Sequence, residues 1–132
     1  MFGNAGYAAA RARYRDIDIG SKVEGASPHR LIAILYEELL KTLDTIAAGL
    51  NAGSSANRPG MPERRGRTMS ILMGLEGSLD HSQGGDLSQG LAAVYREARR
   101  LIGEGMREQD PKRIIQAREM VGEIADAWQR IG

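Results

Sequence analysis

The residues whose side chains could carry chemistry are few in this sequence of 132 residues. Cysteine is absent, which excludes disulfides, thiolate nucleophiles and zinc sites built from cysteine. The two histidines, His29 and His81, remain as candidates for acid–base catalysis or metal binding. Carboxylate-bridged metal sites in helical bundles use Glu-x-x-His pairs, but Ala26 and Ser78 stand three residues before these histidines. We therefore predict no metal ligands and no cofactor.

The run Asp80-His81-Ser82 contains the three residue types of a hydrolase triad. Residues adjacent in sequence cannot adopt the geometry of that triad, and the chain has no G-x-S-x-G motif to form a nucleophile elbow. A phosphate-binding G-x-x-x-x-G-K-[ST] loop is also missing from the sequence. The sequence thus predicts no catalytic residues and a protein that is not an enzyme.

Basic residues gather in one part of the chain without making it cationic as a whole. Lysine and arginine number 18 against 17 acidic residues, which leaves a net charge of +1. A nucleic-acid site needs a larger basic surface and stacking aromatic residues, and aromatic residues are only 5% of the chain. We predict no nucleic-acid partner, and the role of the arginine-rich loop 51–67 stays open. The basic cluster is Arg58, Arg64, Arg65 and Arg67.

Neither membrane insertion nor secretion is expected from the sequence. No apolar run approaches the roughly 18 residues that a membrane-spanning helix needs. The N-terminal sequence MFGNAGYAAARARYRD lacks the charged and then apolar order of a secretory signal. We expect a cytoplasmic protein.

The elements that would position functional residues are helices. Ser27-Pro28 indicates a helix start, because the serine side chain caps a free N–H and proline fits the first turn. Apolar residues then recur every three or four positions, and further ones beside this stripe make the apolar face wider than one helix contact requires. The stripe is Ile32, Leu35, Leu39, Leu43, Ile46 and Leu50.

Glycine and aspartate signals divide the rest of the chain. Gly84 and Gly85 should end a second helix, and Asp86 and Asp110 should cap two more. Short connections make these helices antiparallel neighbours. The fold class is therefore all-α: an antiparallel four-helix bundle over residues 27–132, preceded by a flexible N-terminal segment at 1–26. The expected helices span about 28–50, 63–83, 86–109 and 111–131.

Tyr36 and Tyr95 lie inside strongly apolar helical stretches. The hydroxyl of a buried tyrosine needs a hydrogen-bond partner. Two interpretations remain open: tyrosines in the core of the bundle, or one wall of a groove that receives another helix. Trp128, by contrast, is expected to fill the core.

Several short motifs together resemble the FliS family of flagellar secretion chaperones. They follow the order and spacing of that family from residue 14 to the C-terminus. The matching segments are S-P-H-R-L-I-A-I-L-Y at 27–36, L-x-x-S-L-D-x-x-x-G-G at 75–85, L-A-A-V-Y at 91–95, D-P at 110–111 and A-W at 127–128.

The resemblance implies a function in the bacterial cytoplasm. It implies an export chaperone that binds the disordered C-terminal segment of flagellin in apolar grooves, prevents premature polymerisation and delivers flagellin to the flagellar type III export apparatus. In that family an N-terminal segment with a tyrosine, which Tyr14 matches, occupies part of the groove when flagellin is absent. The same segment contacts the export gate protein.

We expect the client-binding groove to use apolar residues of the first and third helices. A disordered client loses entropy on binding, and a long preformed apolar track that receives its helical segments compensates for this loss. Tyr14 and Ile17 would act as a displaceable cover. The predicted lining residues are Leu31, Ile34, Leu35, Tyr36, Leu91, Tyr95 and Ile102.

An alternative without a secreted client stays open. In it, the protein is a self-associating helical-bundle adaptor that buries the wide apolar face of the first helix against a second copy. The sequence does not identify which flagellin is carried. It also leaves open whether the free protein is a homodimer and whether a co-chaperone or an anti-sigma factor binds.

Overall fold

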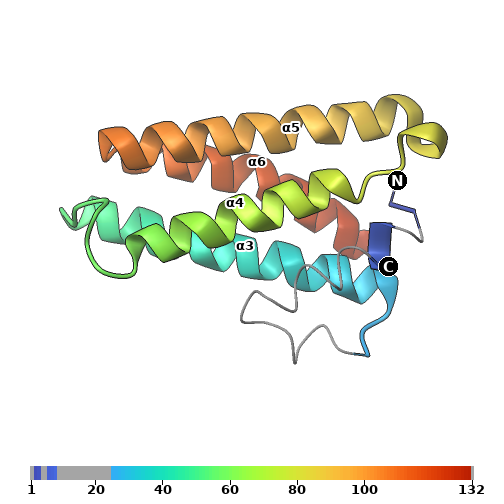
Figure 1. The fold of residues 1–132 in the computed structure, drawn as a ribbon, viewed down its shortest axis with the longest axis horizontal. Helices are drawn as coiled ribbons and strands as arrows, with labels where there is room; N and C mark the ends of the chain where they lie inside the picture. The colour runs from blue at the N-terminus through green and yellow to red at the C-terminus, as the bar shows by residue number, and fades with distance from the viewer. Residues whose placement is uncertain (1, 4–5, 9–24, 132) are drawn as a thin grey trace.

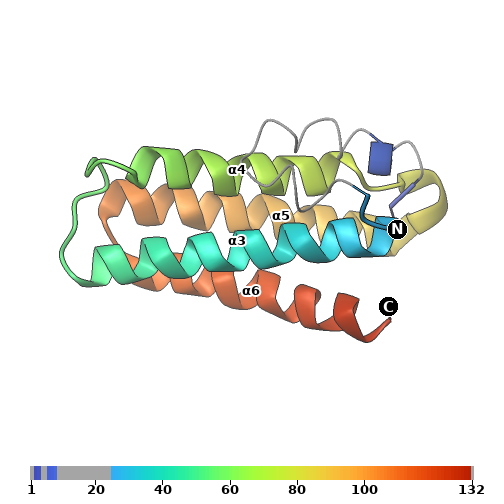
Figure 2. The ribbon, with the colours of Figure 1, turned by 90° about the horizontal axis from the view of Figure 1, so that it is seen from below.

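The structure is a computed structural model, and it describes residues 2–3, 6–8 and 25–131. Four long helices lie side by side, each antiparallel to the next along the chain (Figure 1). The first and third of them each pack against the second and fourth (Figure 2). The prediction of an all-α antiparallel four-helix bundle is confirmed. The helices are α3 (Pro28–Asn51), α4 (Met61–Gly77), α5 (His81–Glu108) and α6 (Pro111–Arg130).

Side-chain caps begin α3 and α6 where the sequence predicts them. The Ser27 hydroxyl accepts the backbone N–H of Arg30 at 3.1 Å, and Pro28 occupies the first turn. The Asp110 carboxylate accepts the backbone N–H of Lys112 at 3.0 Å. Each cap satisfies an N–H group that has no partner within its helix.

The predicted boundary between the second and third helices is wrong. The second helix, α4, ends at Gly77 instead of residue 83, and Asp80 caps α5 in place of Asp86. The Asp80 carboxylate accepts the backbone N–H groups of Ser82 at 3.1 Å and Gln83 at 3.2 Å. The third helix therefore begins five residues earlier than predicted, at His81.

Gly85 breaks the regular geometry of α5 after its first turn. Its φ of 53° and ψ of −129° are not helical and produce a kink. Glycine adopts this positive φ without the steric penalty that a side chain would bring. The glycine signal thus marks a real break, but the break lies inside α5 and not between two helices.

A tight corner joins α5 and α6. Gln109 ends α5 in the left-handed conformation, with φ of 52°. A Cβ atom on Gly105 would lie 2.8 Å from Cδ1 of Ile114 and 3.1 Å from the backbone oxygen of Asp110. The lack of a side chain at Gly105 lets the two helices approach closely here.

The core lies along the axis of the bundle, where the apolar stripes of the four helices meet. Tyr36 of α3 and Tyr95 of α5 are both buried, and their hydroxyl oxygens lie 2.7 Å apart. Trp128 is buried near the end of α6, as predicted. Within the part of the chain that the structure describes, no helix combines the length and the apolar character that a membrane crossing requires.

Candidate functional site

The seven residues predicted to line a groove all lie inside the protein. Even Leu91, the most exposed of them, has only 8% of its surface accessible. In this conformation a ligand reaches these side chains only after a covering group moves. The buried residues are Leu31, Ile34, Leu35, Tyr36, Leu91, Tyr95 and Ile102.

The first turns of α3 are buried more completely than a helix of a four-helix bundle requires. Residues 31–36 are six consecutive buried positions, and at about 100° per residue they face every direction around the helix axis. Two neighbouring helices, α4 and α6, cover only one side of α3. Ile34 lies about 140° around the helix from the core residue Leu39, yet only 4% of its surface is exposed. The outer surface of these turns is therefore apolar and covered.

Residues near the start of the chain dock at one end of the bundle. Phe2 pairs with Leu79 through a single antiparallel bridge. The ring of Phe2 meets Trp128 edge-on, with 5.6 Å between the ring centroids. The ring centroids of Phe2 and Tyr7 are 6.2 Å apart. Both aromatic residues pack against the core. We call Phe2 and Tyr7 the N-terminal anchor.

Glycine makes the close fit of this segment possible. The Ser78 hydroxyl donates to the backbone oxygen of Gly6 at 3.3 Å. A Cβ atom on Gly6 would lie 2.4 Å from the backbone oxygen of Ser78, which is closer than atoms can approach. The packing of the N-terminal anchor thus extends to the backbone between α4 and α5.

His29 and Trp128 hold the start of α3 against the end of α6. Their rings are stacked, with centroids 4.6 Å apart and planes within 8° of each other. The Trp128 indole N–H donates to the backbone oxygen of His29 at 3.0 Å, and Nε2 of His29 lies 2.8 Å from the backbone oxygen of Trp128. His29 therefore has a structural role here, and no group of three metal-ligating side chains occurs among the described residues.

The residues predicted to act as a cover, Tyr14 and Ile17, lie outside the described residues. The site that the structure defines consists of two parts. One is the covered outer surface of the first turns of α3, and the other is the N-terminal anchor at the adjoining end of the bundle.

Comparison with known proteins assigns the family. The profile of the family described as flagellar protein FliS matches residues 10–132. The chain belongs to the FliS family. This confirms the resemblance read from the sequence motifs.

Relatives from several bacteria align over most of the chain, and each is named flagellar secretion chaperone FliS. The relative from Vibrio cholerae serotype O1 is 26% identical over 118 residues, which are 89% of this chain and 85% of the relative. The one from Salmonella typhimurium is 28% identical over 120 residues, 89% of this chain and 86% of the relative. The one from Escherichia coli is 30% identical over 118 residues, 88% of this chain and 84% of the relative. Members of this family are chaperones, so the prediction that the protein is not an enzyme is confirmed.

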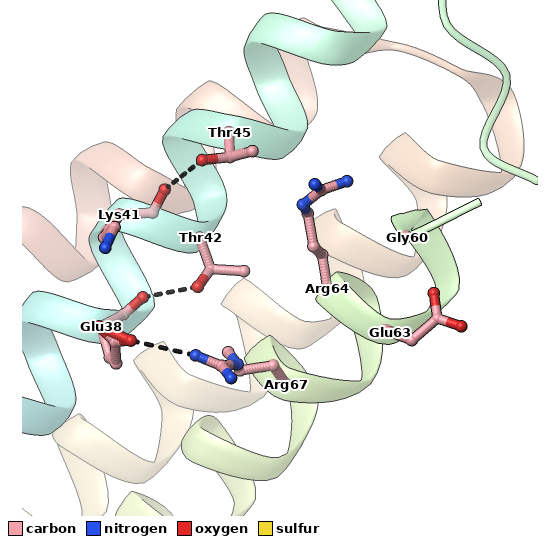
Figure 3. Close-up of a pocket in the computed structure, with 8 residues that line it drawn as sticks. All are labelled: Glu38, Lys41, Thr42, Thr45, Gly60, Glu63, Arg64 and Arg67. Carbon is pink, nitrogen blue, oxygen red and sulfur yellow. Dashed lines mark hydrogen bonds and ion pairs between the residues drawn. The ribbon is translucent and has the colours of Figure 1, made fainter. Parts of the chain in front are cut away.

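The surface of this FliS-family chain has a furrow between α3 and α4 that is mainly polar. Arg67 forms an ion pair with Glu38 across it at 3.0 Å. The Thr42 hydroxyl donates to the backbone oxygen of Glu38 at 2.7 Å, so it is already engaged within α3. Figure 3 shows Arg64 extending into the space between the helices while Glu63 points away from it. The polar lining differs from the apolar groove that the sequence predicts.

A second furrow lies on the other side of α4, between α4 and α5. Arg64, Arg65 and Arg67 belong to one basic cluster in the sequence, but the helix turns Arg65 toward α5 and the other two toward α3. Arg65 is followed on the same face by Met69 and Met73, at spacings of four residues. This spacing was the signal in the sequence that could have identified the α5 side of α4 as a surface of mixed arginine and methionine.

Proposed function

We propose that this protein is a cytoplasmic export chaperone that binds the disordered C-terminal segment of flagellin. Binding prevents premature polymerisation, and the chaperone delivers flagellin to the flagellar type III export apparatus by contact with an export gate protein. Membership of the FliS family and relatives named flagellar secretion chaperones support the role. The structural observation that carries the proposal is the burial of the apolar outer surface of α3. The neighbouring helices of the bundle cover only one side of α3, so they do not explain this burial.

The N-terminal segment is the cover of this surface in the proposal, with Tyr14 and Ile17 as its apolar contacts. The N-terminal anchor supports this role, because Phe2 and Tyr7 fix the start of the segment at the end of the bundle where α3 begins. A client that displaces the cover gains the apolar contacts that the cover loses. Exchange of one segment for another leaves no large apolar surface in water at any stage.

Within the predicted groove, the residues divide by the direction they face. Ile34 points away from the bundle axis, and Leu31 lies about 80° around the helix from Leu39, at the edge of the interior face. These two form the part of the groove that a displaced cover uncovers first. The remaining five support that surface from within the core, namely Leu35, Tyr36, Leu91, Tyr95 and Ile102.

Binding of a flagellin C-terminal peptide to wild-type protein and to Ile34→Glu tests the proposal. Wild type should form a complex of one peptide per chaperone, measured by isothermal titration calorimetry. A carboxylate at position 34 removes apolar contact and introduces a charge that must be desolvated, so the affinity should fall about tenfold or more. Since Ile34 faces outward, circular dichroism should show an intact helical bundle.

Ile115→Glu is the matched control. Ile115 lies on α6, and 44% of its surface is exposed. The same substitution there should leave peptide binding unchanged. The proposal fails if wild-type protein forms no complex, or if folded Ile34→Glu binds as tightly as the control.

The alternative of a self-associating adaptor finds less support in the surface of the bundle. The wide apolar face of the first helix is buried within the chain at 31–36. Large apolar residues that are exposed in the described part of the chain are scattered over three helices and the chain end: Met73, Leu87, Ile115 and Ile131. Sedimentation with and without a flagellin C-terminal peptide separates the two functions, because the chaperone should give a 1:1 complex with the peptide.

A further inference from the structure

The furrow between α4 and α5, here called the α4–α5 furrow, has an apolar floor. Met69 and Met73 of α4 line it, and 52% of the surface of Met73 is exposed. On α5, a Cβ atom on Gly103 would meet nothing within 4 Å, so the furrow is open at this point. Methionine side chains are flexible and polarizable and adapt their shape to different apolar partners. The floor is thus suited to receive apolar side chains from outside.

Arginines outnumber the one carboxylate, Glu104, among the residues that line this furrow. Within the described part of the chain, neither Arg65 on α4 nor Arg107 on α5 pairs with a carboxylate, and both are exposed. Arg96 and Arg99 share the single carboxylate of Glu76, at 2.8 Å and 2.6 Å. One carboxylate cannot neutralise two guanidinium groups, so this pair adds to the positive potential of Arg65 and Arg107.

The behaviour of Glu76 agrees with this arrangement. Its partial burial would raise the pKa of the carboxyl, but hydrogen bonds from Arg99 and Arg96 hold that pKa below its usual value. Glu76 therefore stays ionised and committed to these arginines. It is not available to neutralise Arg65 or Arg107.

A basic rim around an apolar floor is complementary to one kind of segment. We propose that the α4–α5 furrow binds an amphipathic helix of a partner protein whose apolar stripe is flanked by acidic residues. Apolar side chains at helical spacing would contact Met69, Met73 and Gly103, and carboxylates would pair with Arg65 and Arg107. From Arg96 to Arg107 the furrow is roughly 16 Å long, which matches about three turns of a helix. The assignment does not depend on flagellin being the client.

The test uses a designed helical peptide as the probe. Leucines at helical spacing form its apolar stripe, glutamates flank the stripe, and a fluorophore reports binding through anisotropy. A second peptide carries lysine at every glutamate position. The acidic peptide should bind the full-length protein, with an affinity that falls as salt screens the charges, and the basic peptide should bind at least about tenfold more weakly.

Charge reversal locates the site. The double variant Arg65→Glu and Arg107→Glu should lose at least about tenfold in affinity for the acidic peptide, because both side chains are exposed and break no ion pair when replaced. Lys112→Glu with Arg130→Glu is the matched control, since both lie on α6, diagonally opposite α4. This control changes the net charge equally and should bind almost as wild type does.

Methyl NMR of the methionines gives a readout that does not rely on charge. The acidic peptide should shift the methyl signals of Met69 and Met73 and leave those of Met61 and Met120 in place, since neither of these lines the furrow. The inference is overturned if the acidic peptide does not bind at concentrations up to about 1 mM. It is equally overturned if the basic peptide binds as well, or if the furrow variant and its control behave alike.

Discussion

At the scale of single residues, a hydrogen bond between Tyr36 and Tyr95 joins the two helices lying diagonally across the core. The hydroxyl oxygens are 2.7 Å apart in surroundings closed to water. A buried hydroxyl that loses its partner keeps the penalty of its desolvation. The pair therefore fixes the relative placement of α3 and α5.

We predict that Tyr95→Phe lowers the free energy of unfolding by about 1–3 kcal/mol, because it leaves the Tyr36 hydroxyl unsatisfied. The double variant Tyr36→Phe with Tyr95→Phe should be less destabilised than the sum of the two single variants. Urea denaturation of all four proteins measures the coupling. Additive effects would show that the two hydroxyls do not depend on each other.

Burial of Tyr36 also makes stability depend on alkaline pH. Desolvation raises the pKa of its phenol from 10.0 to about 12, against a smaller opposing effect of the hydrogen bond with Tyr95. The folded state holds this proton more tightly, so the contribution to stability is complete below pH 10 and is lost as the pH rises toward 12. The loss should reach roughly 2–3 kcal/mol.

Tyr36→Phe is the variant that checks this effect. Denaturant unfolding of wild type and variant from pH 8 to pH 12 should show wild type losing stability more steeply above pH 10. Equal slopes for the two proteins would contradict the assignment of this titration to Tyr36.

The role of His29 shows what sequence could not predict at this scale. Its place in the first turn of a helix predicts a surface or capping residue. Its partner Trp128 stands 99 positions further along the chain. Which helix ends meet depends on the packing of the whole bundle, so the stacking of these rings has no local signal.

At the scale of the elements, two glycines of α5 with the same helical geometry should respond oppositely to alanine. Alanine stabilises a helix interior by about 1 kcal/mol relative to glycine. Gly103→Ala should gain up to this amount, because its Cβ would meet nothing within 4 Å. Gly105→Ala should lower stability, because its Cβ would lie 2.8 Å from Ile114 and close to the backbone of Asp110.

Thermal unfolding followed by circular dichroism measures both variants, and each serves as the control of the other. A gain in melting temperature for Gly105→Ala would show that the corner between α5 and α6 is less tightly packed than the structure indicates.

The starts of α3 and α6 could be predicted from sequence, whereas the boundary between α4 and α5 could not. Ser27 and Asp110 cap their helices because the cap depends on a few consecutive residues. The end of α4 depends on tertiary contacts as well: the Ser78 hydroxyl bonds back to Gly74 at 2.7 Å, and Leu79 pairs with Phe2. A partner more than 70 residues away cannot be recognised from the local pattern, in which Gly84 and Gly85 were the next glycine pair able to end a helix.

At the scale of the whole molecule, hydrophobic periodicity predicted the four long helices and their order, and the short connections predicted their antiparallel packing. It also predicted an apolar face on the first helix that exceeds one helix contact. Periodicity does not tell whether such a face is open or covered, because that depends on chain outside the helices. Residues 31–36 are all buried in the structure, so the proposed groove requires a covering group to move before a client can bind.

The central claim is that the client and the N-terminal segment compete for one apolar surface on α3. The most direct measurement compares the affinity of a flagellin C-terminal peptide for the full chain and for a chain that begins at Gly25, with circular dichroism verifying the bundle. Without a cover to displace, the shortened chain should bind about tenfold more tightly or better. Equal or weaker binding by a folded shortened chain would contradict the claim.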